Sequence, residues 1–278
     1  MPPEENSIQL GCQTNAWRMP AGDTARFLNV LARIRSYGFD GFETGFLNIE
    51  THLQDLPGAR RRIEDAGVRF FAVHIFLLQY DPETFLAPED LIQRVARGAR
   101  ELGAERMILS GAPAARDGKF DLGAVQRKAA ALNRAALSCF DAGLRLAYHN
   151  HPPEFLAGGE EIRSLIAATD PTLVSFVLDT GHMSVAGADG VGFFREYHER
   201  TCALHLRDFA GSEQVPLGYG TLDLSAWKKA IDACGWRGWA IAEEERPNDG
   251  RPGDTAVAPA SNALRRTFRP GLAEARHG

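Results

Sequence analysis

The sequence contains no apolar run that could cross a membrane. A membrane-spanning helix needs about 20 consecutive apolar residues, and no stretch of the 278 residues approaches that length. The first seven residues, MPPEENS, are polar and acidic and do not resemble a signal peptide. We therefore expect a cytoplasmic protein that does not bind a membrane.

Positive charge is not in excess. The chain has 31 Lys and Arg residues against 36 Asp and Glu residues, which gives a formal net charge of −5. Proteins that bind nucleic acids neutralise the phosphates with clustered Lys and Arg, and the sequence has no basic stripe of that kind. The charge balance therefore disfavours a nucleic-acid partner.

Cysteine is scarce and scattered. The four cysteines are Cys12, Cys139, Cys202 and Cys234, no two of them form a C-x-x-C pair, and no catalytic-thiol motif surrounds any of them. In a chain of this length, such spacing is typical of reduced thiols buried in a cytosolic protein.

The sequence does contain a repeated unit, in which a helical stretch is followed by a glycine and then by a β-rich apolar run. The unit appears as RSYGFDGFETG, EDAGVRFFAVHIF, RELGAERMILSG, FDAGLRLAYHNH and DACGWRGWAIAEEE. A glycine in the left-handed conformation ends a helix, and continuous apolar runs are typical of strands that are covered on both faces. The pattern therefore predicts βαβ units around a parallel sheet.

Eight strands are predicted in all. They cover residues 8–14, 38–45, 68–76, 105–111, 144–151, 174–181, 202–209 and 238–245, with helical stretches such as 121–143 between them. Eight such units predict a single (β/α)8 TIM barrel over residues 1–278, with a closing loop and helix at about 246–270. A doubly wound open sheet would usually have a Gly-rich phosphate turn after its first strand, where this chain has GCQTNAWRMP.

Histidines and carboxylates gather at the predicted strand ends, where TIM barrels build their active sites. The histidines there are His74, His149, His151, His182 and His205, and the carboxylates include Glu43, Asp179, Asp208, Glu243 and Glu244. Because burying an unpaired polar group is costly, we expect these groups to converge at one barrel mouth. Such a mixed set suits Mn²⁺, Zn²⁺ or Co²⁺, whereas Mg²⁺ prefers oxygen ligands.

Each of these residues also has a purely structural interpretation. A histidine often bridges or caps backbone groups, so His74 could bind a neighbouring strand end. Asp208 could cap the next turn, and for Glu244 we favour a solvated loop carboxylate. The joint occurrence of these residues at strand ends favours a metal site over the separate structural roles.

Five motifs at the strand ends or in the loops that follow them resemble those of a known family. They are YHNH (148–151), LDTGHM (178–183), HLRDF (205–209), PLGYGTLDL (216–224) and GWAIAEE (238–244). Together they resemble the xylose isomerase-like TIM barrels of the sugar phosphate isomerase/epimerase superfamily. This superfamily includes ketose 3-epimerases, hydroxypyruvate isomerase and inosose dehydratase.

The resemblance implies one bound divalent metal ion, with manganese favoured over zinc, cobalt or iron. Epimerases of this family hold the metal with Glu, Asp, His and Glu from four strands, and the last three positions correspond to Asp179, His205 and Glu243. His149 falls at the first position, where the family has Glu. The two-carboxylate epimerase mechanism therefore does not transfer intact, and the Tyr-His-x-His arrangement looks more like the inosose dehydratase branch.

The resemblance also implies proton abstraction next to a carbonyl of a small sugar or cyclitol. We expect Glu243 or His149 to act as the base and His182 as the acid or as the partner of the oxyanion. The candidates for substrate contact are His74, His151, Arg207, Glu43 and Trp17. We expect an isomerase or epimerase, with a dehydratase as the alternative.

Two other classes of function remain open. The fold also occurs in abasic-site endonucleases, although the acidic charge and the shortage of further metal ligands speak against that activity. A metal-free sugar-binding barrel would use the polar strand ends for recognition alone. Dimers are common among such proteins, so the resemblance allows a homodimer, although the sequence has no clear interface pattern.

Overall fold

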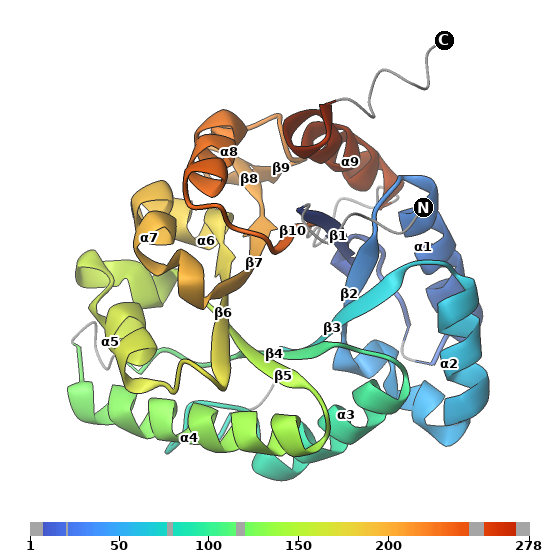
Figure 1. Ribbon diagram of the computed structural model, residues 1–278, viewed down its shortest axis with the longest axis horizontal. Coiled ribbons are helices and arrows are strands. Elements are labelled where there is room, and N and C mark those ends of the chain that lie inside the picture. Colours follow the sequence, from blue (N-terminus) through green and yellow to red (C-terminus); the bar gives the residue numbers. More distant parts are fainter. Residues whose placement is uncertain (1–7, 21, 77–79, 115–119, 245–252, 271–278) are drawn as a thin grey trace.

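The computed structural model describes residues 8–20, 22–76, 80–114, 120–244 and 253–270. Within these ranges, eight parallel strands close into a barrel, and helices surround it (Figure 1). The strand order around the barrel is β1-β2-β3-β4-β5-β6-β7-β10, with β10 pairing with β1. The predicted TIM barrel is therefore confirmed, and the open-sheet alternative is wrong.

All eight predicted strands are present in the barrel. They are β1 (Gln9–Gln13), β2 (Gly41–Gly45), β3 (Arg69–Ile75), β4 (Arg106–Ser110), β5 (Arg145–His149), β6 (Val174–Asp179), β7 (Thr201–Leu206) and β10 (Trp239–Ala242). The longer helices are α1 (Thr24–Ser36), α2 (Leu56–Asp65), α3 (Glu89–Glu101), α4 (Leu122–Asp141), α5 (Glu160–Ala168), α7 (Gly190–Tyr197), α8 (Leu224–Ala233) and α9 (Asp254–Phe268).

Glycines end the helices as the repeated unit predicts. Gly38, Gly67, Gly103, Gly143 and Gly235 all have positive φ, between +61° and +99°. A side chain rarely adopts this conformation, which explains why glycine recurs at the step from helix to strand.

The structure adds elements that the sequence did not predict. The run predicted as one strand over 202–209 ends at Leu206 as β7, and a short antiparallel hairpin of β8 (Asp208–Ala210) and β9 (Glu213–Val215) follows it. The closing helix is present as α9, which includes Pro259, whereas loop residues 246–252 lie outside the described residues.

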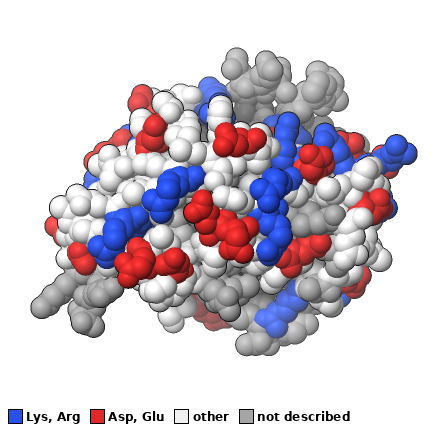
Figure 2. Space-filling view, turned by 90° about the horizontal axis from the view of Figure 1, so that it is seen from below, with Lys and Arg blue, Asp and Glu red and all other residues white. Residues whose placement is uncertain are grey.

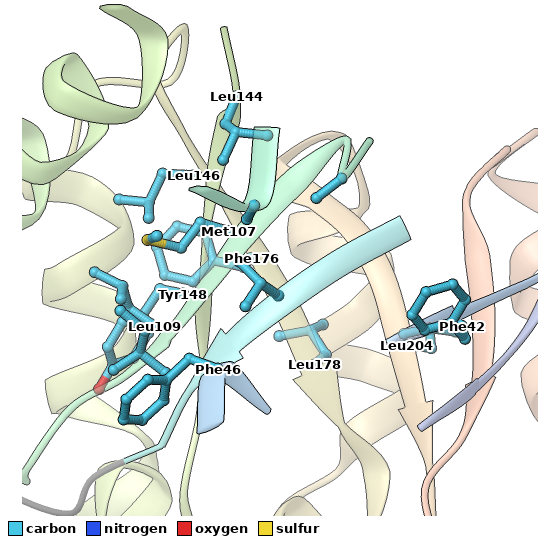
Figure 3. Close-up of a cluster of buried hydrophobic side chains, with 14 of the residues drawn as sticks. Phe42, Phe46, Met107, Leu109, Leu144, Leu146, Tyr148, Phe176, Leu178 and Leu204 are labelled. Atoms are coloured by element: carbon cyan, nitrogen blue, oxygen red, sulfur yellow. The ribbon is translucent and has the colours of Figure 1, made fainter. Parts of the chain in front are cut away.

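Two apolar layers hold the barrel together. On the helix side, alternate strand residues such as Met107, Leu109, Leu146 and Tyr148 gather with Phe176 in one buried cluster (Figure 3). Side chains alternate across a strand, so the residues between them face the barrel interior. The interior layer consists of Phe71, Ala72, Ile108, Ala147, Val177, Ala203, Trp239 and Ile241.

Two glycines make room for the largest residue of the interior layer. A Cβ atom on Gly41 would lie 2.6 Å from the Trp239 ring, and one on Gly11 would lie 3.2 Å from it. Trp239 thus packs against β1 and β2. A side chain at position 41 would displace the indole, whereas one at position 11 would require only a small shift of its neighbours.

The surface is mixed in charge. Figure 2 shows Lys and Arg interspersed with Asp and Glu on one face of the molecule, without a large area of a single sign. On α4, Val125 and Leu132 are buried, whereas Leu122 at the start of the helix is exposed. Within the described ranges, every helix is too short or too polar to span a membrane.

Candidate metal centre and active site

A polar layer lies directly above the apolar interior of the barrel. At or near the end of each of the eight strands lies a buried polar side chain that is at most 3% exposed. These residues are Gln13, Glu43, His74, Ser110, His149, Asp179, His205 and Glu243. The period-2 geometry of a strand therefore brings residues that are far apart in sequence to one barrel end.

Four members of this layer form a cluster that could hold a metal ion. His149, Asp179, His205 and Glu243 each offer one ligand atom, and these atoms lie within 4.8 Å of one another. They come from four neighbouring strands, β5, β6, β7 and β10. They are also the four residues that the sequence resemblance implies as metal ligands.

The ligand atoms of the cluster are buried and lack hydrogen bonds. Asp179 Oδ2, His205 Nδ1, Glu243 Oε2 and both ring nitrogens of His149 have no hydrogen-bond partner among the described residues. His149 Nε2 lies 3.6 Å from Asp179 Oδ2, and His205 Nδ1 lies 2.5 Å from Glu243 Oε2 without the alignment of a hydrogen bond.

An unpaired buried polar atom costs about 1–3 kcal/mol. A divalent cation would satisfy these atoms together, and the donor set of two imidazoles and two carboxylates suits a metal of the Mn²⁺, Zn²⁺ or Co²⁺ type. The residues present therefore fit a metal ion.

Glu43 fixes the orientation of His205 from behind. Its Oε2 lies 2.7 Å from His205 Nε2, and its Oε1 lies 2.9 Å from His74 Nδ1. Burial alone would raise the pKa of Glu43, but His205 and His74 outweigh it and lower the pKa to about 2. The ionised carboxylate can only accept, so His205 Nε2 carries a proton and Nδ1 is the nitrogen that faces the cluster. Burial would lower the pKa of His205, but Glu43 and Glu243 outweigh it and raise that pKa well above its usual value, so a metal ion would displace the Nδ1 proton.

His74 continues this chain of hydrogen bonds. It donates from Nδ1 to Glu43, and its Nε2 lies 2.8 Å from Ser110 Oγ, which can then donate. Burial lowers the pKa of His74 despite its contact with Glu43, which favours a neutral ring. Both nitrogens of His74 thus have protein partners, as the structural interpretation of this residue predicts.

Arg207 bridges two carboxylates of the cluster. Its Nη2 lies 2.8 Å from Glu243 Oε1, and its Nε lies 3.2 Å from Asp179 Oδ2. Burial would raise the pKa values of Asp179 and Glu243, but the guanidinium of Arg207 is the largest influence that lowers them, and both end below their usual range. Both carboxylates are therefore ionised at neutral pH.

The side chains of Asp179 and His182 lie close together because Asp179 caps the short helix that contains His182. Asp179 Oδ1 accepts a 2.7 Å hydrogen bond from the His182 backbone N–H at the start of α6 (Thr180–Val185). The cap orients Oδ2 of the same carboxylate toward the cluster, and His182 Nε2 lies 3.9 Å from it. In the sequence Asp-Thr-Gly-His, one carboxylate thus both caps a helix and offers an oxygen to the candidate metal site.

His151 and His182 line one side of the cluster. Their ring centroids are 5.0 Å apart, and that of His151 is 5.2 Å from that of His149. Burial lowers the pKa of His151 to about 3 and that of His182 to about 4. Both imidazoles are therefore neutral at neutral pH, and each can donate one hydrogen bond and accept another.

Comparison with known proteins identifies the family. The model of the xylose isomerase-like TIM barrel family matches residues 31–267. The chain belongs to the xylose isomerase-like TIM barrel family. The resemblance seen in the sequence motifs is confirmed.

Proteins similar to this chain carry the names of enzymes that act on inosose or on sugars. An inosose dehydratase from Geobacillus thermodenitrificans is 24% identical over 284 residues, covering 87% of this chain and 91% of the relative. An L-ribulose 3-epimerase structure is 22% identical with a TM-score of 0.78, covering 98% of this chain and 99% of that one.

A sugar phosphate isomerase/epimerase from Parabacteroides distasonis is also similar in structure. It is 20% identical, with a TM-score of 0.72 and coverage of 95% of both chains. At such identities the two solved structures establish the shared fold. The family match and the curated relatives support an enzyme of this family.

Of the carboxylates predicted at strand ends, Glu244 and Asp208 have structural partners outside the cluster. Glu244 is 1% exposed and accepts a 3.0 Å hydrogen bond from the Leu217 N–H. The interpretation of Glu244 as a solvated carboxylate is therefore wrong, because the 216–224 loop folds back over it. Asp208 does cap its loop, as predicted, by accepting hydrogen bonds from the N–H groups of Phe209, Gly218, Gly220 and Leu222.

Trp17 follows β1 and the short 3-10 helix Thr14–Ala16. It is 7% exposed and lies beside Gly253, just before α9. Its contact with substrate stays a prediction, as do the contacts proposed for His74 and Glu43.

Sequence reasoning missed three residues that support the cluster. Ser110 and Gln13 belong to the polar layer, and Gln13 Nε2 lies 3.3 Å from Glu43 Oε1. Asn150 Oδ1 accepts a 2.9 Å hydrogen bond from the Asp179 N–H. Ser110 lies within the predicted strand 105–111 and is the last residue of β4, so the alternation that placed His149 could also have placed it.

Proposed function

We propose that this barrel is a divalent-metal-dependent sugar isomerase or epimerase. Its substrate would be a ketose or a related polyol ketone, and its reaction would begin with removal of the proton next to the carbonyl. The observation that carries the proposal is the cluster of buried ligand atoms without hydrogen bonds at the barrel mouth. Xylose isomerase-like relatives named as isomerases and epimerases support it.

The residues that would hold the metal are His149, Asp179, His205 and Glu243, with manganese as the favoured ion. When bound, the ion would act as a Lewis acid toward vicinal substrate oxygens. Glu43 would hold His205 in the tautomer that leaves Nδ1 free to coordinate, because it accepts the Nε2 proton.

Proton transfer would be the task of the groups that border the metal site. Glu243, which is ionised and held by Arg207 at Oε1, would act as the base, with His149 as the alternative. His182 is neutral, so we assign it to hydrogen bonding with the developing oxyanion or to proton return. His151 and Arg207 would bind substrate oxygens, and His74, Glu43 and Trp17 are the further candidates for substrate contact.

An inosose dehydratase-type lyase is the second candidate. Curated relatives that cover nearly the whole chain are named inosose dehydratases, and His149 replaces the first Glu of the epimerases. In this reaction, the same base would remove the proton, and a neighbouring neutral imidazole would relay that proton to the β-hydroxyl, which would leave as water.

Deuterium exchange separates the candidate functions. We would incubate the manganese-loaded protein in D₂O with ketoses and with an inosose, and follow the products by NMR. An isomerase or epimerase incorporates deuterium next to the carbonyl and forms an isomer, whereas a dehydratase forms an unsaturated product. Absence of exchange and product for every substrate, despite bound metal, would contradict both and favour a sugar-binding barrel.

Glu43→Gln tests the proposed support of His205. The amide has one accepting oxygen for two imidazole donors, so we expect Mn²⁺ affinity to fall about 10–100-fold, as measured by calorimetric titration. Ser110→Ala is the matched control, since it removes a group two hydrogen bonds further from His205 than Glu43 and should have a smaller effect. Wild-type affinity in Glu43→Gln would show that this carboxylate does not tune the site.

A further inference from the structure

A second cavity lies at the opposite end of the barrel from the metal cluster. It has a volume of about 550 Å³ and is lined by residues at or near the starts of seven barrel strands. Strands of a parallel barrel all start at one end and finish at the other. A ligand in this cavity would therefore be separated from the cluster by the apolar interior layer.

Arginine dominates the charged lining of this cavity. The arginines are Arg69, Arg106, Arg145, Arg200 and Arg237, and the carboxylates are Glu105 and Glu199. The lining thus has a formal net charge of +3 on a chain whose net charge is −5. A concave surface lined by one sign of charge concentrates ions of the opposite sign.

Two of the five arginines have structural roles. Arg69 forms two hydrogen bonds with Glu105, of 2.9 Å and 3.0 Å, and lies 5.0 Å from the Trp239 ring centroid. Arg200 donates to the carbonyls of Ile166 and Thr169 near the end of α5. Their positions are explained by these contacts.

The other three arginines have no carboxylate partner in the part of the chain that the structure describes. Arg106 and Arg145 are register partners on β4 and β5, and Arg106 reaches Ser175 Oγ on β6 at 3.2 Å. Arg237 donates to the Trp236 carbonyl at 2.9 Å. Three positive charges around one cavity repel one another. A bound multivalent anion would attract all three and offset that repulsion.

We propose that this cavity binds a small phosphate-bearing molecule at a site distinct from the metal cluster. Guanidinium groups match phosphate oxygens in geometry as well as charge. The volume of the cavity suits a small molecule, and the acidic chain disfavours a nucleic acid. The three arginines lie on β4, on β5 and just before β10, so they come together only in the folded barrel. An anion that binds all three therefore binds the folded state alone and stabilises it by mass action.

Inorganic pyrophosphate is the probe for this site. We would titrate it into the metal-free full-length protein by calorimetry and follow the thermal unfolding midpoint in parallel. Wild type should bind and unfold at a higher temperature, and Arg145→Ala and Arg237→Ala should each weaken binding about tenfold or more. Both side chains are exposed, so neither variant should impair folding.

Two controls locate the binding. Arg134→Ala removes an exposed arginine of α4 that does not line the cavity, and it should bind pyrophosphate as wild type does. Asp179→Ala should also bind normally if the site is separate from the metal cluster. The proposal is overturned if wild type does not bind, if Arg134→Ala weakens binding as much as Arg145→Ala does, or if Asp179→Ala abolishes it.

Discussion

Glu243→Gln is expected to lower kcat/KM about 1,000-fold, because the variant loses both the proposed base and a metal ligand. The substitution preserves the size of the side chain but removes its charge, which the structure shows paired with Arg207 and close to His205. The measurement is the rate of proton exchange on the substrate identified by the D₂O screen, at saturating Mn²⁺.

Glu244→Gln is the matched control for this experiment. Glu244 is equally buried and adjacent in sequence, but it accepts a hydrogen bond from the Leu217 N–H rather than facing the cluster. The amide oxygen of Gln can retain that bond, so activity should stay close to wild type. Equal losses in the two variants would indicate a general effect of charge or folding and would contradict the assignment of Glu243.

Lys128→Met is expected to destabilise the protein by about 3 kcal/mol, because it removes the cation that is paired with the buried carboxylate of Glu154. Lys128 is fully buried on α4, and its Nζ lies 2.6 Å from Glu154 Oε1 and 3.0 Å from Glu161 Oε1. Tyr148 also donates to Glu154. Burial raises the pKa of Glu154 although Lys128 opposes this, so proton uptake by Glu154 absorbs part of the cost.

Chemical denaturation would measure this loss of stability. Lys228→Met is the matched control, since it breaks a partly exposed pair with Asp232 and should cost less than about 0.5 kcal/mol. The double variant Lys128→Met/Glu154→Gln should recover part of the stability, because it removes one unpaired charge. A Lys128→Met variant as stable as Lys228→Met would contradict the assigned importance of this network.

The Lys128 network also reaches the candidate active site. Glu154 Oε2 accepts a 2.8 Å hydrogen bond from the His151 backbone N–H, and Glu161 Oε1 accepts one from the Ala114 N–H. The network thus ties the loops after β4 and β5 to α4. His151 is therefore positioned by side chains that do not themselves border the metal cluster.

The sequence predicted the barrel and its polar end because both follow from strand alternation. In the runs that contain Val177 and Asp179, or Ala203 and His205, an apolar residue is followed two positions later by a polar one. Successive inward positions along a strand share one side, so the strand assignment alone placed the ligands at the barrel mouth. The five helix-ending glycines are equally local, since only φ at one residue is involved.

The remaining features depend on contacts between distant segments. Whether Glu244 is solvated depends on the fold-back of a loop 27 residues away in sequence, and the buried state of Lys128 depends on Glu154 and Glu161 from other elements. The β8-β9 hairpin interrupts a run whose composition is still that of a strand. Local patterns carry no information about these tertiary partners.

The central claim is that His149, Asp179, His205 and Glu243 hold a metal ion. The most direct test is elemental mass spectrometry of wild type and Asp179→Ala, both purified without added metal. We predict about one equivalent of manganese, zinc, cobalt or iron per wild-type chain and its loss in the variant. A wild-type protein that contains no metal and binds no Mn²⁺ on titration would contradict the claim.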